Sequence, residues 1–429
     1  MLKKFKKKLY FLVASYFVFW AKLVLRKWQP KIIVVTGSTG KTTLFSLLRS
    51  QLSEEAEFAD KANSAFGIPF NILGLERKSF SVWEWIGLIV KAPGQTTKKP
   101  LRERKKLYVV EADSDRPGEA KVIAHLLKPE IVLMLNVYQT HAMNFESLAA
   151  EKQQPVLQVI AEEFATFATT AKEKVLVNGD NVALVNAIDQ LSLPPGKVEF
   201  LQEQDYLLAY SLTTSGTDFT VEKHKYHFNE LLPEEVWVSL AMVDKVLQML
   251  TRRVNEQYPN LIFPGGRSGV LRGIKNTTLI DSTYNANLGS MEAILKLFEQ
   301  YPAVGPKWLV LGHMLEEGTE TTKQHEALTW LVLQTKTIER IFLVGKENRE
   351  VTLPLLQQYF QGRQVEYFET PKMLLQQLSK DLQGGETILF KGAPFLEGMV
   401  ERLLADKNDT VKLVRREPIW EKRRQNFYA

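Results

Sequence analysis

The chain has 429 residues, enough for two or more domains that each bury a core. Its apolar content of 45% and charged content of 24% are typical of soluble globular proteins. It contains no cysteine, which excludes disulfides, thiolate catalysis and cysteine-held zinc. The net charge is +6, but residues 1–31 carry nine cations and no acid, which leaves −3 on the rest. Nucleic-acid-binding proteins more often spread cations over the folded surface, so we expect no nucleic-acid partner.

The N-terminal segment, residues 1–30, combines lysines with an apolar and aromatic run over residues 9–25, interrupted only by Ser15 and Lys22. This run is shorter than the roughly 20 residues that span a bilayer comfortably. We expect a helix that lies on or dips into the inner face of the plasma membrane, attached through residues 1–28. Such an attachment should be removable without loss of the fold. A buried helix packed on the first domain and a single membrane span are the alternatives.

A glycine-rich turn follows the apolar run Ile32–Val35, which predicts a short buried strand, and precedes a helical pattern from Leu44. The predicted ATP-binding residues of this turn are Gly37, Ser38, Thr39, Gly40, Lys41, Thr42 and Thr43. Backbone N–H groups at a helix start bind phosphate, Lys41 would reach the terminal phosphates, and the Thr42 hydroxyl would bind Mg²⁺. A glycine-rich turn without a ligand is the alternative.

Two regions alternate short apolar strands with helical stretches, which predicts an α/β fold with parallel sheets. We place the first domain at residues 31–258 and the second at residues 259–429. The predicted strands are Ile32–Val35, Leu107–Val110, Ile131–Leu135, Val175–Val177, Thr278–Ile280, Trp308–Leu311, Ile341–Val344, Val365–Phe368 and Thr387–Phe390. We expect residues 91–106 to be a basic solvated loop, with contact to an anionic ligand as the alternative. The basic tail from Arg415 should also be solvated.

Several motifs recur in an order that resembles the Mur ligase family over residues 31–404. They are Thr36-Gly37 to Thr43, Asn63 to Pro69, Glu111 to Glu119, Asn136 to His141, Asn178-Gly179-Asp180, Gly266-Arg267, Asp281 to Asn287, Leu311 to Gly318, His325 and Lys391-Gly392. The segment Tyr284-Asn285-Ala286-Asn287 is most similar to the branch that adds D-alanyl-D-alanine. The resemblance implies a central P-loop ATPase-like domain and a C-terminal Rossmann-like domain. The family's usual N-terminal uridine-binding domain is replaced by the basic apolar segment.

The resemblance also implies how Mg²⁺ and the catalytic groups are arranged. Glu111, at the end of an apolar strand, would bind Mg²⁺, which prefers oxygen ligands, although an N-cap or surface role is open. His141 resembles a histidine that contacts a second Mg²⁺. Lys152 resembles a lysine that the family carbamylates with CO₂, but its spacing from His141 is short, and an exposed helical lysine is the alternative.

In the second domain the planar guanidinium of Arg267 could clamp phosphate oxygens. Asp281 would bind a ribose hydroxyl, and the nucleotide or the attacking amine would contact Tyr284, Asn285 and Asn287. The predicted substrate-binding residues are Asn63, Ser64 and Lys391.

The resemblance implies an ATP-dependent amide ligase that works through an acyl phosphate in a cleft between domains. Its partners would be a nucleotide-linked muramoyl-peptide and an amine or dipeptide, and its location the cytoplasm. Departures from the family pattern include Ser282, His313 and Pro233-Glu234-Glu235. The alternatives are a polyglutamate-type synthetase of the same superfamily and a catalytically weakened nucleotide-binding scaffold of cell-wall synthesis.

Overall fold

The computed structural model describes residues 2–60, 62–77, 81–97, 105–314, 318–393 and 395–428. The chain forms two compact units. The first comprises Met1–Val137, Asn144–Tyr206 and Val238–Leu261, and the second comprises Tyr138–Met143, Leu207–Trp237 and Ile262–Ala429. The predicted domain boundary after residue 258 remains a prediction. The compact units do not follow one boundary along the chain, because the second unit also includes Tyr138–Met143 and Leu207–Trp237.

Six strands form the sheet of the first unit. Their bounds are β1 Lys31–Thr36, β2 Ala56–Phe58, β3 Leu107–Ala112, β4 Ile131–Met134, β5 Lys174–Asn178 and β6 Val198–Leu201. They lie in the order β2-β3-β1-β4-β5-β6, and every pairing is parallel. Strand β1 is therefore flanked by β3 and β4, and the segments that follow these three strands meet at one edge of the sheet.

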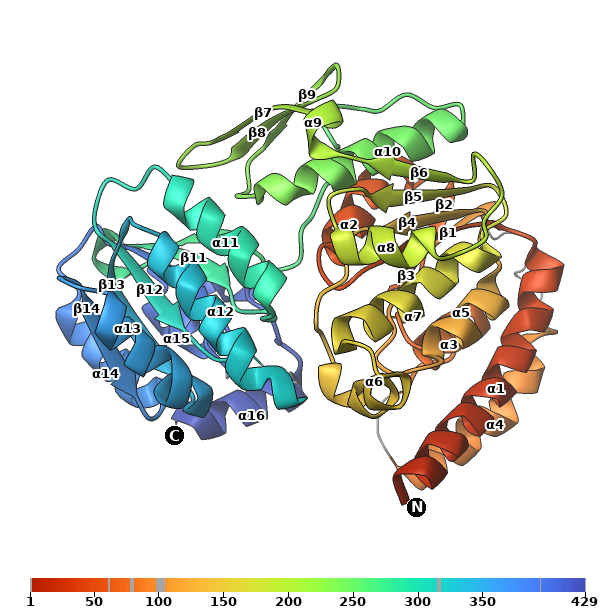
Figure 1. Cartoon of the computed structure of the whole chain (residues 1–429), viewed down its shortest axis with the longest axis horizontal. Helices are drawn as coiled ribbons and strands as arrows, with labels where there is room; N and C mark the ends of the chain where they lie inside the picture. The colour runs from red at the N-terminus through yellow and green to blue at the C-terminus, as the bar shows by residue number, and fades with distance from the viewer. Residues whose placement is uncertain are drawn as a thin grey trace. The chain divides into compact units, whose positions relative to one another are not determined.

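Helices cover both faces of this sheet. They are α1 Leu2–Trp28, α2 Lys41–Leu52, α3 Gly67–Leu73, α4 Val82–Gln95, α5 Glu119–Leu127, α6 Glu146–Lys152, α7 Val156–Thr170, α8 Val182–Asp189, α9 Glu203–Tyr206 and α10 Trp237–Met249. One core joins alternate strand residues, such as Val34, Val110 and Val132, to apolar residues of α3, α5 and α7. Helices α2 and α10 lie on the opposite face (Figure 1).

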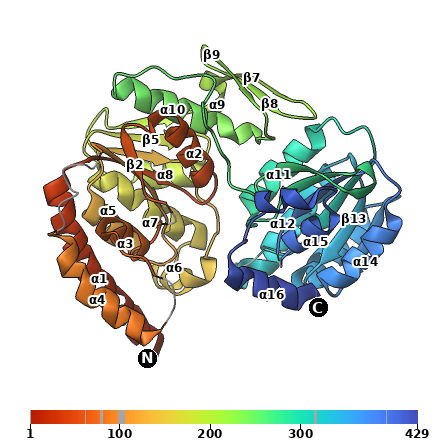
Figure 2. The same ribbon diagram turned by 180° about the vertical axis from the view of Figure 1, so that it is seen from behind.

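The N-terminal helix α1 is part of this core. Its residues Ala14, Phe17, Ala21 and Val24, spaced three or four apart, are at most 1% exposed and pack in the same cluster as α3 and α4. Both views show α1 beside α4 along one edge of the unit (Figure 1, Figure 2). The expectation that residues 1–28 could be removed without loss of the fold is therefore wrong, because removal would uncover this core.

The second unit includes an antiparallel sheet of three strands, β7 Leu207–Leu212, β8 Thr217–Val221 and β9 His224–Phe228. Its main sheet has the order β10-β11-β15-β12-β13-β14. The bounds are β10 Gly269–Arg272, β11 Thr278–Ser282, β12 Lys307–Leu311, β13 Ile338–Val344, β14 Gln364–Phe368 and β15 Thr387–Lys391. Among the described strands of this main sheet only β10 runs antiparallel to its neighbour, so the predicted α/β class is confirmed in both units.

The helices of the second unit are α11 Leu288–Gln300, α12 Thr321–Gln334, α13 Leu353–Tyr359, α14 Pro371–Asp381, α15 Glu397–Leu403 and α16 Pro418–Tyr428. Strand residues alternate between two cores. Leu309 packs in the core that holds α11, α12 and α13, whereas Val310 packs in the core that holds α14 and α15. This alternation is the two-residue period expected of a sheet covered on both faces.

Residues 91–106 do not form the uniform loop that we expected. The first five of them complete α4, which continues to Gln95 because Ala92 remains buried on its inner side. Residues 98–104 lie outside the described residues. Leu315, Glu316 and Glu317 of the predicted family motif also lie outside them.

Candidate active site

The predicted phosphate-binding turn connects β1 to α2 in a conformation that requires glycine. Gly37 and Gly40 have φ angles of 139° and 80°, which side chains of L-residues rarely allow. A Cβ atom on Gly37 would also lie 3.0 Å from the backbone N and O of Asn136. Glycine at position 37 therefore allows the turn to pack directly against the backbone of the segment after β4. Helix α2 starts immediately after the turn, at Lys41.

Asn136 holds this turn in place. Its side-chain Oδ1 accepts a hydrogen bond from the Thr39 N–H at 2.8 Å, and its Nδ2 donates to the Thr39 carbonyl at 3.2 Å. The Ser38 N–H donates to the Asn136 carbonyl at 2.9 Å. The sequence showed Asn136 only as a member of a motif, because nothing in its position along the chain predicts contact with residues 97 positions earlier.

Lys41 is buried and paired with a carboxylate. Its Nζ lies 2.8 Å from Asp113 Oδ2 and donates to the Gly37 carbonyl. Burial would lower the pKa of Lys41, but the charges of Asp113 and Glu111 outweigh burial and raise it. The ammonium is therefore a permanent cation at the phosphate-binding turn. Asp113 was missed as a site residue, although it follows β3 at the same edge of the sheet.

Thr42 and Glu111 provide two oxygens suited to Mg²⁺. The Thr42 hydroxyl lies 3.3 Å from Glu111 Oε2, because Val35 of β1 pairs in register with Glu111 of β3. Mg²⁺ binds hard oxygen ligands and usually completes its shell with phosphate and water. This pair fits that requirement. Among the described residues no group of three His, Asp or Glu side chains could hold a metal ion by itself.

His141 lies in the segment Tyr138–Met143, which groups with the second unit. Its φ angle is 55°, a left-handed conformation that few non-glycine residues adopt. Lys152, at the end of α6, forms an ion pair of 2.6 Å with Glu162 of α7. This contact gives Lys152 a role other than metal binding. Both predicted catalytic functions remain predictions.

The predicted substrate-binding loop is tied to the acidic motif after β3. The Asn63 carbonyl accepts from the Asp113 N–H at 2.8 Å, and Ser64 Oγ accepts from the Gly67 N–H at 3.1 Å at the start of α3. The Ala65 N–H donates to Glu119 Oε1 at 2.9 Å. The loop and the phosphate-binding turn are thus connected through Asp113, which contacts both Asn63 and Lys41.

Thr43, the last of the predicted ATP-binding residues, follows Thr42 in the first turn of α2 and is only partly exposed.

In the second unit, Asp281 is fully buried at the end of β11. Its Oδ1 accepts from the Thr283 hydroxyl at 2.7 Å and from the Thr283 N–H at 3.1 Å. Burial raises the pKa of Asp281 despite these hydrogen bonds and despite the opposing charges of Arg415 and Lys391. Within the described part of the chain, Asp281 Oδ2 is buried and has no hydrogen-bond partner. An acceptor of this kind suits a ligand hydroxyl, as predicted for ribose.

Lys391 ends β15, which pairs with β11, and it lies opposite Ser282; its charge and that of Asp281 act on one another. Its Nζ donates to the Asn285 carbonyl at 2.7 Å. Burial and the positive charge of Arg267 together lower the pKa of Lys391 to about 7, although the charge of Asp281 opposes the shift. Lys391 can therefore lose its proton near neutral pH.

The remaining predicted residues surround this pair. The Arg267 guanidinium lies 4.0 Å from the centre of the Tyr284 ring, and the ring is 44% exposed. Asn285 is exposed. Asn287 instead begins α11, where its Oδ1 accepts from the Ser290 N–H and Ser290 Oγ accepts from the Asn287 N–H. This capping box supplies a structural reason for Asn287, and its predicted contact with ligand remains a prediction.

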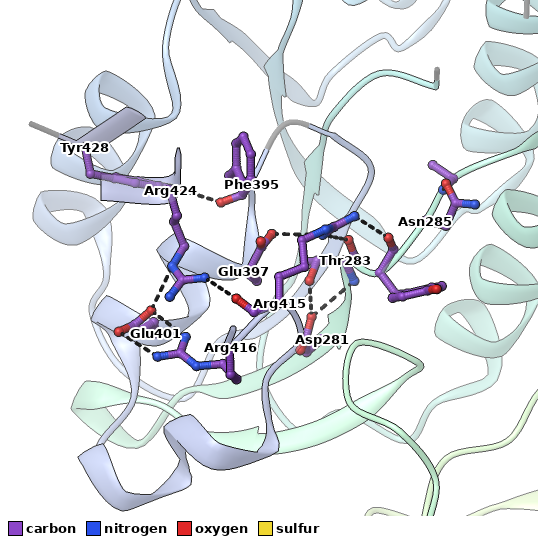
Figure 3. A network of polar contacts seen from close by, with 12 residues as sticks. Asp281, Thr283, Asn285, Phe395, Glu397, Glu401, Arg415, Arg416, Arg424 and Tyr428 are labelled. Carbon is purple, nitrogen blue, oxygen red and sulfur yellow. Dashed lines mark hydrogen bonds and ion pairs between the residues drawn. The ribbon is translucent and has the colours of Figure 1, made fainter. Parts of the chain in front are cut away.

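The C-terminal tail is not the solvated basic end that we expected. Figure 3 shows Arg415 directed at Glu397 and at the loop after β11, with Arg424 and Arg416 directed at Glu401. Arg415 donates to the carbonyls of Thr283 and Tyr284, and Arg424 is only 3% exposed. The prediction was wrong for Arg415, Arg416 and Arg424, because they pair with Glu397 and Glu401 of α15. Lys422 and Arg423 are exposed, as expected.

The family models match both units. The one described as the Mur ligase middle domain matches residues 35–228, and the one described as the Mur ligase glutamate ligase domain matches residues 266–394. Together these matches span more than half of the chain.

Two similar relatives are UDP-N-acetylmuramoyl-tripeptide–D-alanyl-D-alanine ligases. That of Bacillus subtilis is 23% identical over 383 residues, which are 87% of this chain and 75% of the relative. That of Borreliella burgdorferi is 24% identical over 404 residues, which are 90% of this chain and 76% of the relative.

Solved structures with the same fold include the MurF ligase of Thermotoga maritima in complex with ADP. It has a TM-score of 0.70 and 18% identity, with 96% of this chain and 84% of the other covered. MurF of Acinetobacter baumannii has a TM-score of 0.71 and 17% identity, with 92% and 80% covered. At such identity these structures establish the fold alone. The two family models and the relatives identify this chain as a MurF-like member of the Mur ligase family.

Proposed function

We propose that this chain is an ATP-dependent amide ligase that joins D-alanyl-D-alanine or a similar amine to a UDP-linked muramoyl-peptide in the cytoplasm. The observation that carries the proposal is the phosphate-binding turn with its buried Lys41 beside the Thr42–Glu111 pair. The relatives from Bacillus subtilis and Borreliella burgdorferi, named for this reaction, support the choice of substrates.

The reaction would proceed in two balanced steps. First, a carboxylate oxygen of the peptide attacks the γ-phosphorus of ATP, forming an acyl phosphate as the bond to ADP breaks. Second, the amine nitrogen attacks the acyl carbon, the C–O bond to phosphate breaks, and the nitrogen loses a proton. The products are an amide, ADP and inorganic phosphate.

The residues of the first unit would act on the phosphates. The N–H groups of the turn and the start of α2 bind phosphate oxygens, and Lys41 neutralises charge on the transferring group. Thr42 and Glu111 would hold Mg²⁺, which supplies further charge neutralisation when bound. Asp113 would keep Lys41 charged and oriented.

The residues of the second unit would act on the other ligands. Arg267, stacked on Tyr284, presents a guanidinium to phosphate oxygens, and Asp281 offers a buried acceptor to a hydroxyl. Lys391 would help to seat the incoming substrate. His141 as a contact to a second Mg²⁺ and carbamylation of Lys152 belong to this proposal as well. So does closure of the two domains around the substrates.

The test incubates purified full-length protein with ATP, Mg²⁺, UDP-muramoyl tripeptide and D-alanyl-D-alanine, and measures phosphate release and product mass. Phosphate release that requires both substrates, with a product of the joined mass, supports the ligase. Turnover with glutamate in place of the dipeptide would support the polyglutamate-type alternative. Nucleotide binding without turnover on either substrate set would support the scaffold alternative.

A further inference from the structure

Helices α1 and α4 form a pair whose inner side is fixed to the first unit. The Tyr16 hydroxyl of α1 donates to the Ile89 carbonyl of α4 at 2.8 Å, and Lys27 Nζ donates to the Thr96 carbonyl at 2.7 Å. Inside the pair, the Phe17 ring lies 4.7 Å from that of Phe70. These contacts determine which side of each helix remains available to a partner.

The outer side of the pair is apolar, which is unusual for a surface. We call this surface the α1–α4 face; its residues are Leu9, Leu12 and Phe19 of α1 with Val82, Trp83, Ile86, Ile89 and Val90 of α4. Leu12, Trp83 and Val90 are 70%, 82% and 72% exposed. On α4 the exposed apolar residues recur at three- and four-residue spacing, and on α1 Leu12 and Phe19 are seven residues, or about two turns, apart on the same side. Large apolar side chains gathered in this way mark a protein or membrane interaction site.

Charge on the same helices favours an anionic partner. The first turns of α1 carry Lys3, Lys4, Lys6, Lys7 and Lys8 in the sequence, its last turn carries Arg26 and Lys27, and residues 1–31 contain no acid. Lys91 lies near the end of α4, and the sequence that follows is again basic. An apolar stripe with lysines and an exposed tryptophan is the composition of helices that lie in the interface of an anionic bilayer.

Over Leu9–Trp28, α1 is long and apolar enough to cross a membrane by length and composition. Its packing argues for a different placement. The Tyr10 hydroxyl donates to Glu119 Oε1 at 2.7 Å, and Phe17, Ala21 and Val24 are buried in the unit's core. Crossing a bilayer would break this hydrogen bond and separate the core, since a spanning helix must leave the protein body.

We propose that the α1–α4 face lies flat on an anionic phospholipid bilayer, with the apolar residues of both helices inserted among the acyl chains and exposed cations such as Arg26 and Lys91 at the headgroups. The face is independent of the ligase reaction, because none of its residues belongs to the candidate active site. Helix α4 contributes as much of the apolar surface as α1, so attachment does not depend on the N-terminal segment alone.

The test measures co-sedimentation of the full-length protein with vesicles of phosphatidylglycerol and phosphatidylcholine, and with vesicles of phosphatidylcholine alone. The variant Trp83→Glu/Val90→Glu places two charges on the α4 stripe without touching α1. The control Val182→Glu changes a residue that is 69% exposed at the first position of α8. Circular dichroism and thermal unfolding confirm that each variant folds.

We expect the wild type and Val182→Glu to bind the anionic vesicles and the double variant to bind at least about tenfold more weakly. Binding of the wild type should also weaken as salt is raised. Equal binding of all three proteins would overturn the proposal. So would wild-type protein that binds no vesicles but forms a dimer that the double variant loses, because the face would then join two copies.

The distinction between lying on and crossing the membrane needs a second measurement. Membranes of cells that produce the full-length protein are washed at alkaline pH in carbonate. Release of the protein from the membrane supports attachment at the surface. Retention after the wash would show that α1 crosses the bilayer and would overturn the flat orientation.

Discussion

Two buried lysines, one in each unit, follow the same structural rule but have opposite electrostatic surroundings. Lys41 begins the helix after β1, and Lys391 ends β15, so each lies at the carboxyl edge of a parallel sheet. Carboxylates on β3 and just after it raise the pKa of Lys41. Burial and Arg267 lower the pKa of Lys391 to about 7.

The difference shows how surroundings rather than residue type decide what a lysine does. Lys41 faces two carboxylates and stays charged, which suits a group that neutralises phosphate. Lys391 faces one buried carboxyl group and a guanidinium, so its charged form is costly, and it is suited to giving up its proton. The two positions therefore respond differently to substitution and to pH.

The largest effect is expected from substitution of Lys41, the lysine that stays charged. Lys41→Ala removes the cation at the phosphates, and turnover should fall at least about a hundredfold. Lys31→Ala, at the exposed start of β1, the strand that leads into the phosphate-binding turn, is the control and should retain activity. Phosphate release in the ligase assay measures both. Activity of Lys41→Ala close to wild type would refute the assignment of the phosphate-binding turn.

A smaller effect should follow from releasing the loop that Lys391 contacts. Arg415→Ala removes hydrogen bonds to the Thr283 and Tyr284 carbonyls and leaves the buried Glu397 without its partner at 3.3 Å. The free energy of unfolding should drop by about 2 kcal/mol in chemical denaturation. Arg423→Ala, exposed in α16, serves as the control. An unchanged midpoint for Arg415→Ala would mean that the tail does not support the loop.

Asn136→Ala separates the shape of the phosphate-binding turn from the charge of Lys41, because it loosens the turn and keeps the lysine. Loss of the three hydrogen bonds between the Asn136 side chain and Thr39 should weaken ATP binding about tenfold. Titration calorimetry with ATP and Mg²⁺ gives the dissociation constant. Asn186→Ala on the exposed side of α8 should bind as the wild type does. Equal affinity for both variants would indicate that the turn holds its shape without Asn136.

The pH dependence of stability tests Lys391 directly. Between about pH 7 and its ordinary pKa of 10.5, this lysine is neutral in the folded protein and charged in the unfolded chain. The unfolded state then binds more protons, so the free energy of unfolding should rise with pH, by at most about 1.4 kcal/mol per pH unit. Lys391→Met should remove this rise, whereas Lys380→Met on α14 should keep it. A rise of equal slope in Lys391→Met would assign it to another group.

The smallest effect is expected at Lys152. If its ion pair with Glu162 is its only role, Lys152→Gln should lower stability and turnover only slightly, since exposed pairs contribute about 0–1 kcal/mol. Turnover is measured with and without added bicarbonate. A large loss in the variant, together with bicarbonate dependence in the wild type, would instead support the predicted carbamylation.

Most of the buried strands could be predicted from local patterns in the sequence. The strands around Ile33, Val109 and Leu309 were predicted because buried parallel strands are short apolar runs, and the ATP-binding turn because Gly37, Gly40 and Lys41 are needed at that spacing. Strands β6 and β7 were missed, since their partly exposed residues lack such runs, whereas the edge strand β14 was predicted from its run Val365–Phe368.

Contacts between distant segments could not be read from the chain. The hydrogen bonds between Asn136 and Thr39 form because β4 lies beside β1. The position of Arg415 depends on its ion pair with Glu397 of α15. The family resemblance supplied residue roles that no local pattern gives, such as those of Asp281 and Lys391. Their protonation behaviour follows only from burial, which the structure reveals.

A single carboxylate connects the N-terminal helix to the candidate substrate loop. Glu119 Oε1 accepts from both the Tyr10 hydroxyl and the Ala65 N–H, and burial raises the pKa of this carboxyl group. A shift of α1 therefore reaches the backbone two residues from Asn63 through only two hydrogen bonds. Attempts to produce a more tractable enzyme should keep this helix and alter its outward-facing residues, because shortening the chain would remove the Tyr10 partner of Glu119 beside the candidate substrate loop.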